Sequence, residues 1–136
     1  MNISVSQEQG RVPVTVIKLD GQLDGQTYQD LISKAKEAQA EGGRDFLIDM
    51  TDLTYISSAG LVALHSVALL TQGEALPDTD HGWSALHSMS RTSGSTVQEH
   101  IKLLNPREDV KSVLDMVGFG NVFEIFTDLD EAVKSF

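Results

Sequence analysis

Apolar and polar residues alternate along the first part of the chain, which is typical of strands whose two faces differ. This pattern covers residues 3–6 and 12–19, and residues 9–11 form the turn between the two segments. Pro13 cannot donate a hydrogen bond to a neighbouring strand, so we expect it at a strand start or at a sheet edge. The acids and glycines of residues 20–25 then predict an exposed loop.

Helical spacing replaces the alternation in residues 27–41, where apolar residues recur every three or four positions. This spacing predicts a helix with one buried face. Gly42 and Gly43 follow directly and predict that the helix ends in a left-handed cap. The apolar residues of the predicted face are Tyr28, Leu31, Ile32, Ala35 and Ala38.

A change of period marks the centre of the chain. Residues 46–51 alternate like a strand, whereas from residue 61 onward the apolar positions have helical spacing. A strand is therefore predicted to pass into a helix across residues 56–60, with Ser57 and Ser58 at the junction. The stripe of this second helix consists of Leu61, Leu64, His65 and Ala68, with Val62 and Leu69 beside it.

Two further strand and helix pairs are predicted in the last third of the chain. Residues 101–104 form a short apolar strand, and Pro106 suits the first turn of the next helix with Asn105 as its N-cap. Residues 122–126 predict a last strand, and Asp128 caps a final helix. The apolar stripes are Val110, Val113, Leu114 and Val117 on the first of these helices, and Leu129, Ala132, Val133 and Phe136 on the second.

Residues 71–99 show neither period and are rich in glycine, serine and threonine. Loops longer than about 12–15 residues are uncommon in compact domains. We therefore predict a flexible insertion here, with a short helix over residues 83–89 as its one candidate element. Trp83 and Met89 are candidate contact residues within it.

Strands that alternate with helices predict an α/β fold around a mixed, mainly parallel sheet of four to five strands, with about four helices. The two opening strands, joined by a short turn, should form an antiparallel pair at one side of it. At 136 residues the chain fits one domain, residues 1–136, which includes the insertion.

Composition restricts the function classes. A formal charge of -10 and a pI near 4.6 argue against direct binding of nucleic acid, because lysine and arginine hold phosphate backbones. The absence of cysteine excludes disulfides and thiolate chemistry. No apolar run approaches the roughly 20 residues of a membrane-spanning helix, and no basic, apolar leader opens the chain. We therefore expect a cytoplasmic protein without membrane insertion.

The two serines at the predicted strand-to-helix junction have two interpretations. Serine is a favoured N-cap, because its oxygen accepts a hydrogen bond from a free N–H of the first helical turn. The same N–H groups and the helix dipole also suit a phosphate group. Local chemistry alone favours the capping role.

Three segments of the chain resemble the STAS domain family, in particular stand-alone bacterial anti-sigma-factor antagonists. Residues 20–24, Asp-Gly-Gln-Leu-Asp, followed by Thr27, resemble the Gly-Glu-Leu-Asp loop of that family. Residues 52–61 resemble its strand-to-helix signature, and residues 113–123 resemble its late helix with a glycine exit. The three segments occur in the family's order and span nearly the whole chain outside the insertion.

The resemblance implies a STAS-like fold and a non-catalytic anti-sigma-factor antagonist that binds a serine-kinase anti-sigma factor. Counting back from Gly60, the family's regulatory phosphoserine falls on Ser58, and Ser57 is the second choice. Ser57 stands where the family has aspartate, and Ala59 replaces its second hydroxyl residue. The partner-binding surface implied by the resemblance comprises Asp24, Thr27, Ser57, Ser58, Ala59 and Gly60.

Other interpretations of the same residues are weaker or remain open. Asp24 is equally well explained as an ordinary turn acid. The spacings of His65, His81, His87 and His100 match no zinc pattern, so no metal site and no cofactor are predicted. His65 is better explained as a hydrogen-bonded packing residue. Catalysis is not expected, because no histidine lies in obvious reach of Ser58 and no nucleophile or phosphate-loop motif is present.

Two other binding roles remain as alternatives. The chain could be the STAS subunit of a membrane transport complex of the ABC type for lipids or anions. It could also be a nucleotide or small-ligand sensor that uses the helix N-terminus as a phosphate site.

Overall fold

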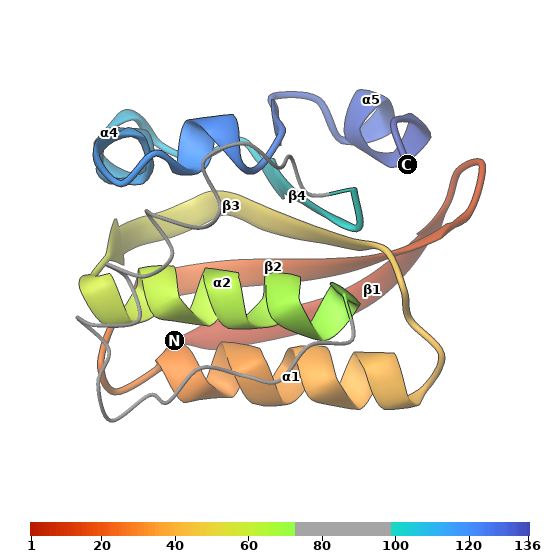
Figure 1. Cartoon of the computed structure of the whole chain (residues 1–136), viewed down its shortest axis with the longest axis horizontal. Helices are drawn as coiled ribbons and strands as arrows, with labels where there is room; N and C mark the ends of the chain where they lie inside the picture. The colour runs from red at the N-terminus through yellow and green to blue at the C-terminus, as the bar shows by residue number, and fades with distance from the viewer. Residues whose placement is uncertain (73–98) are drawn as a thin grey trace.

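A computed structural model describes residues 1–72 and 99–136. Its five strands form one sheet in the order β1-β2-β3-β4-β5 (Figure 1). β1 runs antiparallel to β2, and the other neighbours are parallel, which confirms the predicted α/β fold with an antiparallel pair at one side. The strands are β1 (Asn2–Gln9), β2 (Pro13–Leu23), β3 (Phe46–Ile56), β4 (Ile101–Leu104) and β5 (Ile125–Phe126). The helices are α1 (Tyr28–Ala40), α2 (Ser58–Gln72), α4 (Glu108–Met116) and α5 (Leu129–Lys134), with a short 3-10 helix η2 (Phe119–Asn121).

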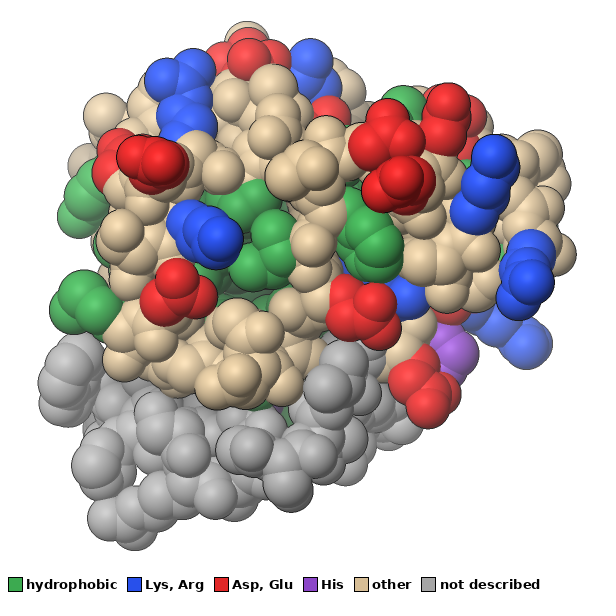
Figure 2. All heavy atoms as spheres, turned by 90° about the horizontal axis from the view of Figure 1, so that it is seen from above, with side chains coloured by type: hydrophobic (Ala, Val, Ile, Leu, Met, Phe, Trp, Pro, Cys, Tyr) green, Lys and Arg blue, Asp and Glu red, His purple; other side chains and the backbone are tan. Residues whose placement is uncertain are grey.

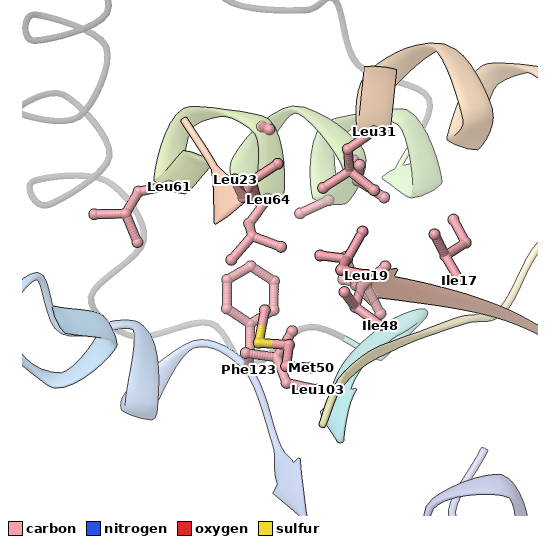
Figure 3. Packing of buried hydrophobic residues seen from close by; sticks show 14 of the residues in the cluster. Ile17, Leu19, Leu23, Leu31, Ile48, Met50, Leu61, Leu64, Leu103 and Phe123 are labelled. Atoms are coloured by element: carbon pink, nitrogen blue, oxygen red, sulfur yellow. The ribbon is translucent and has the colours of Figure 1, made fainter. Parts of the chain in front are cut away.

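The main hydrophobic core lies on the face of the sheet that α1 and α2 cover. Ile17 and Leu19 of β2 and Ile48 of β3 point toward these helices, and Phe123 lies under Leu64 of α2 (Figure 3). α2 is more deeply buried than its predicted stripe, because Ala63, Ser66 and Val67 are also below one tenth exposure. Four of the five residues predicted for the buried face of α1 are buried, namely Leu31, Ile32, Ala35 and Ala38, whereas Tyr28 is half-buried.

A smaller apolar cluster lies on the opposite face of the sheet. We call this the second face and define it by the side chains of Val14, Val16 and Leu47. Ala132 and Val133 of α5 pack against it. α5 covers only the part of this face near the amino ends of the parallel strands. Figure 2, which looks onto α4 and α5, shows hydrophobic side chains between charged ones of both signs.

Three predicted helix ends are confirmed. Gly42 has a φ of 103°, and the N–H of Gly43 donates to the Ala38 carbonyl at 2.9 Å, which closes α1 in a Schellman motif. Gly118 ends α4 with a φ of 79°. The Asp128 carboxylate accepts a hydrogen bond from the Glu131 N–H at 3.2 Å, so it is the N-cap of α5.

Replacing Asp128 by alanine should lower the free energy of unfolding by about 1 kcal/mol, because the Glu131 N–H loses its acceptor. Asp130, exposed in the first turn of the same helix, is the matched control. Asp130→Ala should cost less than about 0.5 kcal/mol, since it removes only an interaction with the helix dipole. Urea unfolding of the two variants measures the difference, and equal losses would contradict the cap assignment.

The predicted loop of residues 20–25 is wrong for its first part. β2 continues to Leu23 and pairs with β3, which itself continues to Ile56. The extension is stable because Leu23, Leu53 and Ile56 are buried on the core face. The acids and glycines had predicted a loop here. The backbone is irregular but remains in the strand, and Gly21 accommodates the irregularity with a φ of 122°.

Two predictions near the C-terminus are also wrong. Asn105 is not the N-cap of α4, because its N–H donates to the Phe126 carbonyl at 2.7 Å and so extends the pairing of β4 with β5. Arg107 occupies the N-cap position instead. Residues 122–126 form a strand only at Ile125 and Phe126, since Val122 and Phe123 follow the 3-10 helix and are buried in the core.

Thr71 and Gln72, which the predicted insertion included, belong to α2. The flexibility predicted for residues 71–99 concerns residues that are almost all outside the described part of the chain. The same is true of the helix predicted over residues 83–89 and of Trp83, Met89, His81 and His87. They remain predictions.

Candidate functional site

Ser57 forms the junction between β3 and α2 and is the N-cap of α2. Its N–H donates to the Leu23 carbonyl at 2.9 Å, which keeps it in register with β2. Its own carbonyl accepts the Leu61 N–H at 3.0 Å, and its Oγ accepts the Gly60 N–H at 3.4 Å. The capping role that local chemistry favoured therefore falls on Ser57.

Ser58 is the first residue of α2, and its side chain is exposed. Among the described residues no hydrogen bond holds the Ser58 hydroxyl. Ala59 is half-buried beside it. Since the neighbouring serine provides the cap, the Ser58 hydroxyl lies at a helix N-terminus where another protein can reach it.

Gly60 is buried and is therefore part of the packing at this junction. A Cβ at this position would lie 2.7 Å from both the Leu23 carbonyl oxygen and Ile56 Cγ1. The backbone of α2 approaches β2 closely here because residue 60 has no side chain. Gly60 thus fixes where the helix starts and does not itself present a surface.

Asp24 and Thr27 hold each other in the turn that leads into α1. Thr27 Oγ1 accepts the Asp24 N–H at 3.0 Å and donates to the Gln22 carbonyl at 2.7 Å. The Asp24 carboxylate accepts the Gln26 N–H at 2.9 Å. Both side chains are half-buried and engaged within the turn.

The structure brings five of the six predicted surface residues to one edge of the sheet. Leu23 of β2 pairs with Ile56 of β3, so the turn at Asp24 and the junction at Ser57 follow from neighbouring strand ends. The carboxyl ends of parallel strands are where loops gather functional side chains in open α/β sheets. Gly60 is the exception, since it lies beneath this edge.

A row of side chains on the second face was not predicted from the sequence. The register of β3 against β2 shifts twice, between Lys18 and Asp20 and between Gly21 and Gln22. At the first shift β3 advances three residues while β2 advances two, and at the second β3 advances two while β2 advances one. The outward-pointing residues of β3 are therefore not at alternate positions. The outward pairs are Lys18 with Asp49, Asp20 with Asp52, and Gln22 with Tyr55.

Charge is concentrated in this row. Lys18 Nζ lies 3.1 Å from the Asp52 carboxylate, and both side chains are about half exposed. The hydrogen bond that the Lys18 ammonium donates to the Asp52 carboxylate raises the pKa of Lys18, and the negative charges of Asp52, Asp49 and Asp20 add to the rise. The three carboxylates therefore surround one cation on an open surface.

The histidines that the structure describes do not form a metal centre. His65 is half-buried on α2, and burial lowers the pKa of its imidazole, so it is neutral at pH 7. His100 Nδ1 lies 2.8 Å from the Asp45 carboxylate at the start of β4. Within residues 1–72 and 99–136 no three histidine, aspartate or glutamate residues lie close enough together to hold a metal ion.

A hollow of about 550 Å³ lies away from Ser58, between the ends of α1 and α2. Gln39, Arg44, Leu70 and His100 are among its lining residues. Arg44 and His100 precede β3 and β4, so this hollow is at the amino ends of the strands, whereas Ser58 follows a carboxyl end. Across the described part of the chain no helix is long and apolar enough to cross a membrane.

The family model described as STAS domain matches residues 5–73, slightly more than half of the chain. The chain belongs to the STAS domain family. The matched residues run from β1 through α2 and so include the junction at Ser57 and Ser58. No curated protein sequence matches the chain.

Solved structures of anti-sigma factor antagonists share the fold. One from Mycobacterium paratuberculosis has a TM-score of 0.64 at 17% sequence identity, covering 98% of this chain and 93% of that chain. SpoIIAA in its unphosphorylated form has a TM-score of 0.52 at 16% identity over 96% and 92%. The Bacillus cell fate determinant SpoIIAA in the phosphorylated form has a TM-score of 0.53 at 18% identity over 96% of both chains.

Proposed function

We propose that this STAS domain is a non-catalytic, cytoplasmic anti-sigma-factor antagonist. It binds a serine-kinase anti-sigma factor through the sheet edge that carries Ser58, and the sigma factor held by that kinase is then released. Phosphorylation of Ser58 reverses the binding. The fold shared with solved anti-sigma factor antagonists supports this role, and one of those proteins is solved in both phosphorylated and unphosphorylated form.

The observation that carries the proposal is that the two serines have different roles. Ser57 caps α2 with its Oγ, whereas the Ser58 hydroxyl is exposed on the first helical residue. A phosphate on Ser58 would lie at the positive end of the helix dipole, which favours an anion by about 0.3–1 kcal/mol. The fold therefore tolerates the modification.

The effect of the phosphate is on binding. Phosphorylation adds a charge of about -1.5 to -2 at pH 7. It adds this charge at the end of the sheet where the turn at Asp24 also lies, because Leu23 pairs with Ile56. An anion that loses water at the interface without gaining a cationic partner is unfavourable. A partner that docks on the neutral hydroxyl is therefore released when the phosphate is added.

Phosphate transfer tests the proposal directly. The purified chain is incubated with ATP and each serine-kinase anti-sigma factor of the same organism, and the modified residue is located by peptide mass spectrometry. We expect one phosphate on Ser58, none in Ser58→Ala, and continued transfer to Ser57→Ala, which loses only the helix cap. Transfer to Ser57, or no transfer by any of these kinases, would contradict the proposal.

A further inference from the structure

The second face of the sheet is covered at one end and open at the other. α5 packs over Val14, Val16 and Leu47, close to the amino ends of the parallel strands. Farther along the same two strands, β2 and β3 present six outward side chains, and each of them is exposed or half-buried. We call this surface the open half; it consists of Lys18, Asp20, Gln22, Asp49, Asp52 and Tyr55.

Tyr55 is the large apolar side chain of the open half. It is 50% exposed and is the second-to-last residue of β3, three residues ahead of Ser58. Its register partner, Gln22, is also exposed. Tyrosine is among the residues most enriched at binding hot spots, because it buries a large rigid area and keeps a polar end. An aromatic residue at this position is therefore suited to insertion into a partner.

The charges beside Tyr55 indicate what kind of partner surface fits. Asp20, Asp49 and Asp52 are acidic, and Lys18 is already paired with Asp52. Arg107 lies at the β4 side of this surface, where its Nε donates to the Thr51 carbonyl at 3.3 Å. Three carboxylates against these two cations leave the surface acidic, in keeping with the charge of -10 for the whole chain. Complementary potentials steer encounter and select partners.

We infer that the open half is a second contact region for the kinase, with Tyr55 as its anchor in an apolar slot and cationic side chains of the kinase facing Asp49 and Asp52. This inference rests on the proposed function, because it names how the same partner is recognised. The two regions are close along the chain, since β3 ends between Tyr55 and Ser58. They differ in role: Ser58 switches the binding, whereas the open half supplies affinity and partner selectivity.

The binding test uses the kinase that modifies the chain, measured by surface plasmon resonance. Tyr55→Ala should weaken binding by about tenfold or more, whereas Tyr55→Phe should stay within about threefold. Val5→Ala is the matched control, because Val5 is 45% exposed on β1 and should leave the affinity unchanged. If Tyr55→Ala melts below the wild type, Tyr55→Thr, which keeps a β-branched strand residue, replaces it.

The acids are tested by salt dependence. The double variant Asp49→Asn and Asp52→Asn should lower the association rate by about tenfold at low salt and lose this difference near 1 M NaCl, where the Debye length falls to about 3 Å. If Tyr55→Ala and Tyr55→Thr bind with full affinity while Ser58→Asp binds weakly, this inference is overturned and the proposed function stands. If no such kinase binds or modifies the wild-type chain, both fall together.

Discussion

Replacing Phe123 by alanine is expected to lower the free energy of unfolding by about 3–5 kcal/mol. Phe123 is 1% exposed and is among the largest fully buried side chains. Its ring lies beneath Leu64 of α2, close to Met50 and Leu103 (Figure 3), and meets the Phe119 ring edge to face with 5.2 Å between centroids. Truncation leaves a cavity between α2 and the sheet that these neighbours fill only in part.

Met116→Ala provides the matched control for this prediction. Met116 is 84% exposed on α4, so its truncation should change the stability by less than about 0.5 kcal/mol. Urea unfolding followed by circular dichroism measures both variants. A loss below about 1 kcal/mol for Phe123→Ala would mean that the segment after η2 is not part of the core.

Gly60→Ala should cost about 1–3 kcal/mol although alanine is the better helix former by about 1 kcal/mol. The added Cβ would lie 2.7 Å from the Leu23 carbonyl oxygen, which already accepts the Ser57 N–H. Either this hydrogen bond lengthens or the start of α2 moves outward. Both changes displace the segment that holds Ser58.

Gly25→Ala is the control for the glycine substitution, because a Cβ at residue 25 meets no atom within 4 Å. It should leave the free energy of unfolding within about 0.5 kcal/mol of the wild type. Equal stability of Gly60→Ala and Gly25→Ala, measured by urea unfolding, would contradict the close packing of α2 on the end of β2.

Much of the fold could be predicted because the hydrophobic period and the residues that begin or end helices indicate the same elements. The change of period across residues 56–60 located the β3–α2 junction, and Gly42, Gly118 and Asp128 ended or began helices where expected. The same pattern placed Ser58 at the start of α2. Local pattern is sufficient in these places because the local preference and the tertiary packing favour the same structure.

The remaining features depend on contacts between distant segments. The outward row of Asp49, Asp52 and Tyr55 requires two register shifts against β2, which strict alternation along one strand cannot reveal. Lys102 is only 4% exposed, and its Nζ lies 3.0 Å from the Ser135 carbonyl and 4.7 Å from the Phe136 ring centroid. A buried lysine in a strand is stable only through such distant partners, so its sequence position gave no indication of them.

Gly60 shows the limit for the candidate site itself. The family resemblance placed it among the surface residues with Ser58, yet it is buried against Leu23 and Ile56. Successive residues of a helix point to different sides of it, so neighbours in sequence can have opposite environments. Which of them faces a partner follows only from where α2 rests on the sheet.

The most direct test of whether charge at Ser58 controls binding is the affinity of the serine-kinase anti-sigma factor for Ser58→Asp and Ser58→Ala. Ser58→Ala should bind like the unmodified wild type, whereas Ser58→Asp should bind at least about 30-fold more weakly, or about 2 kcal/mol. Circular dichroism and the melting temperature should be the same for both variants, because an exposed first helical residue accepts either side chain. Equal affinity of the two variants would contradict the claim that charge at Ser58 controls binding.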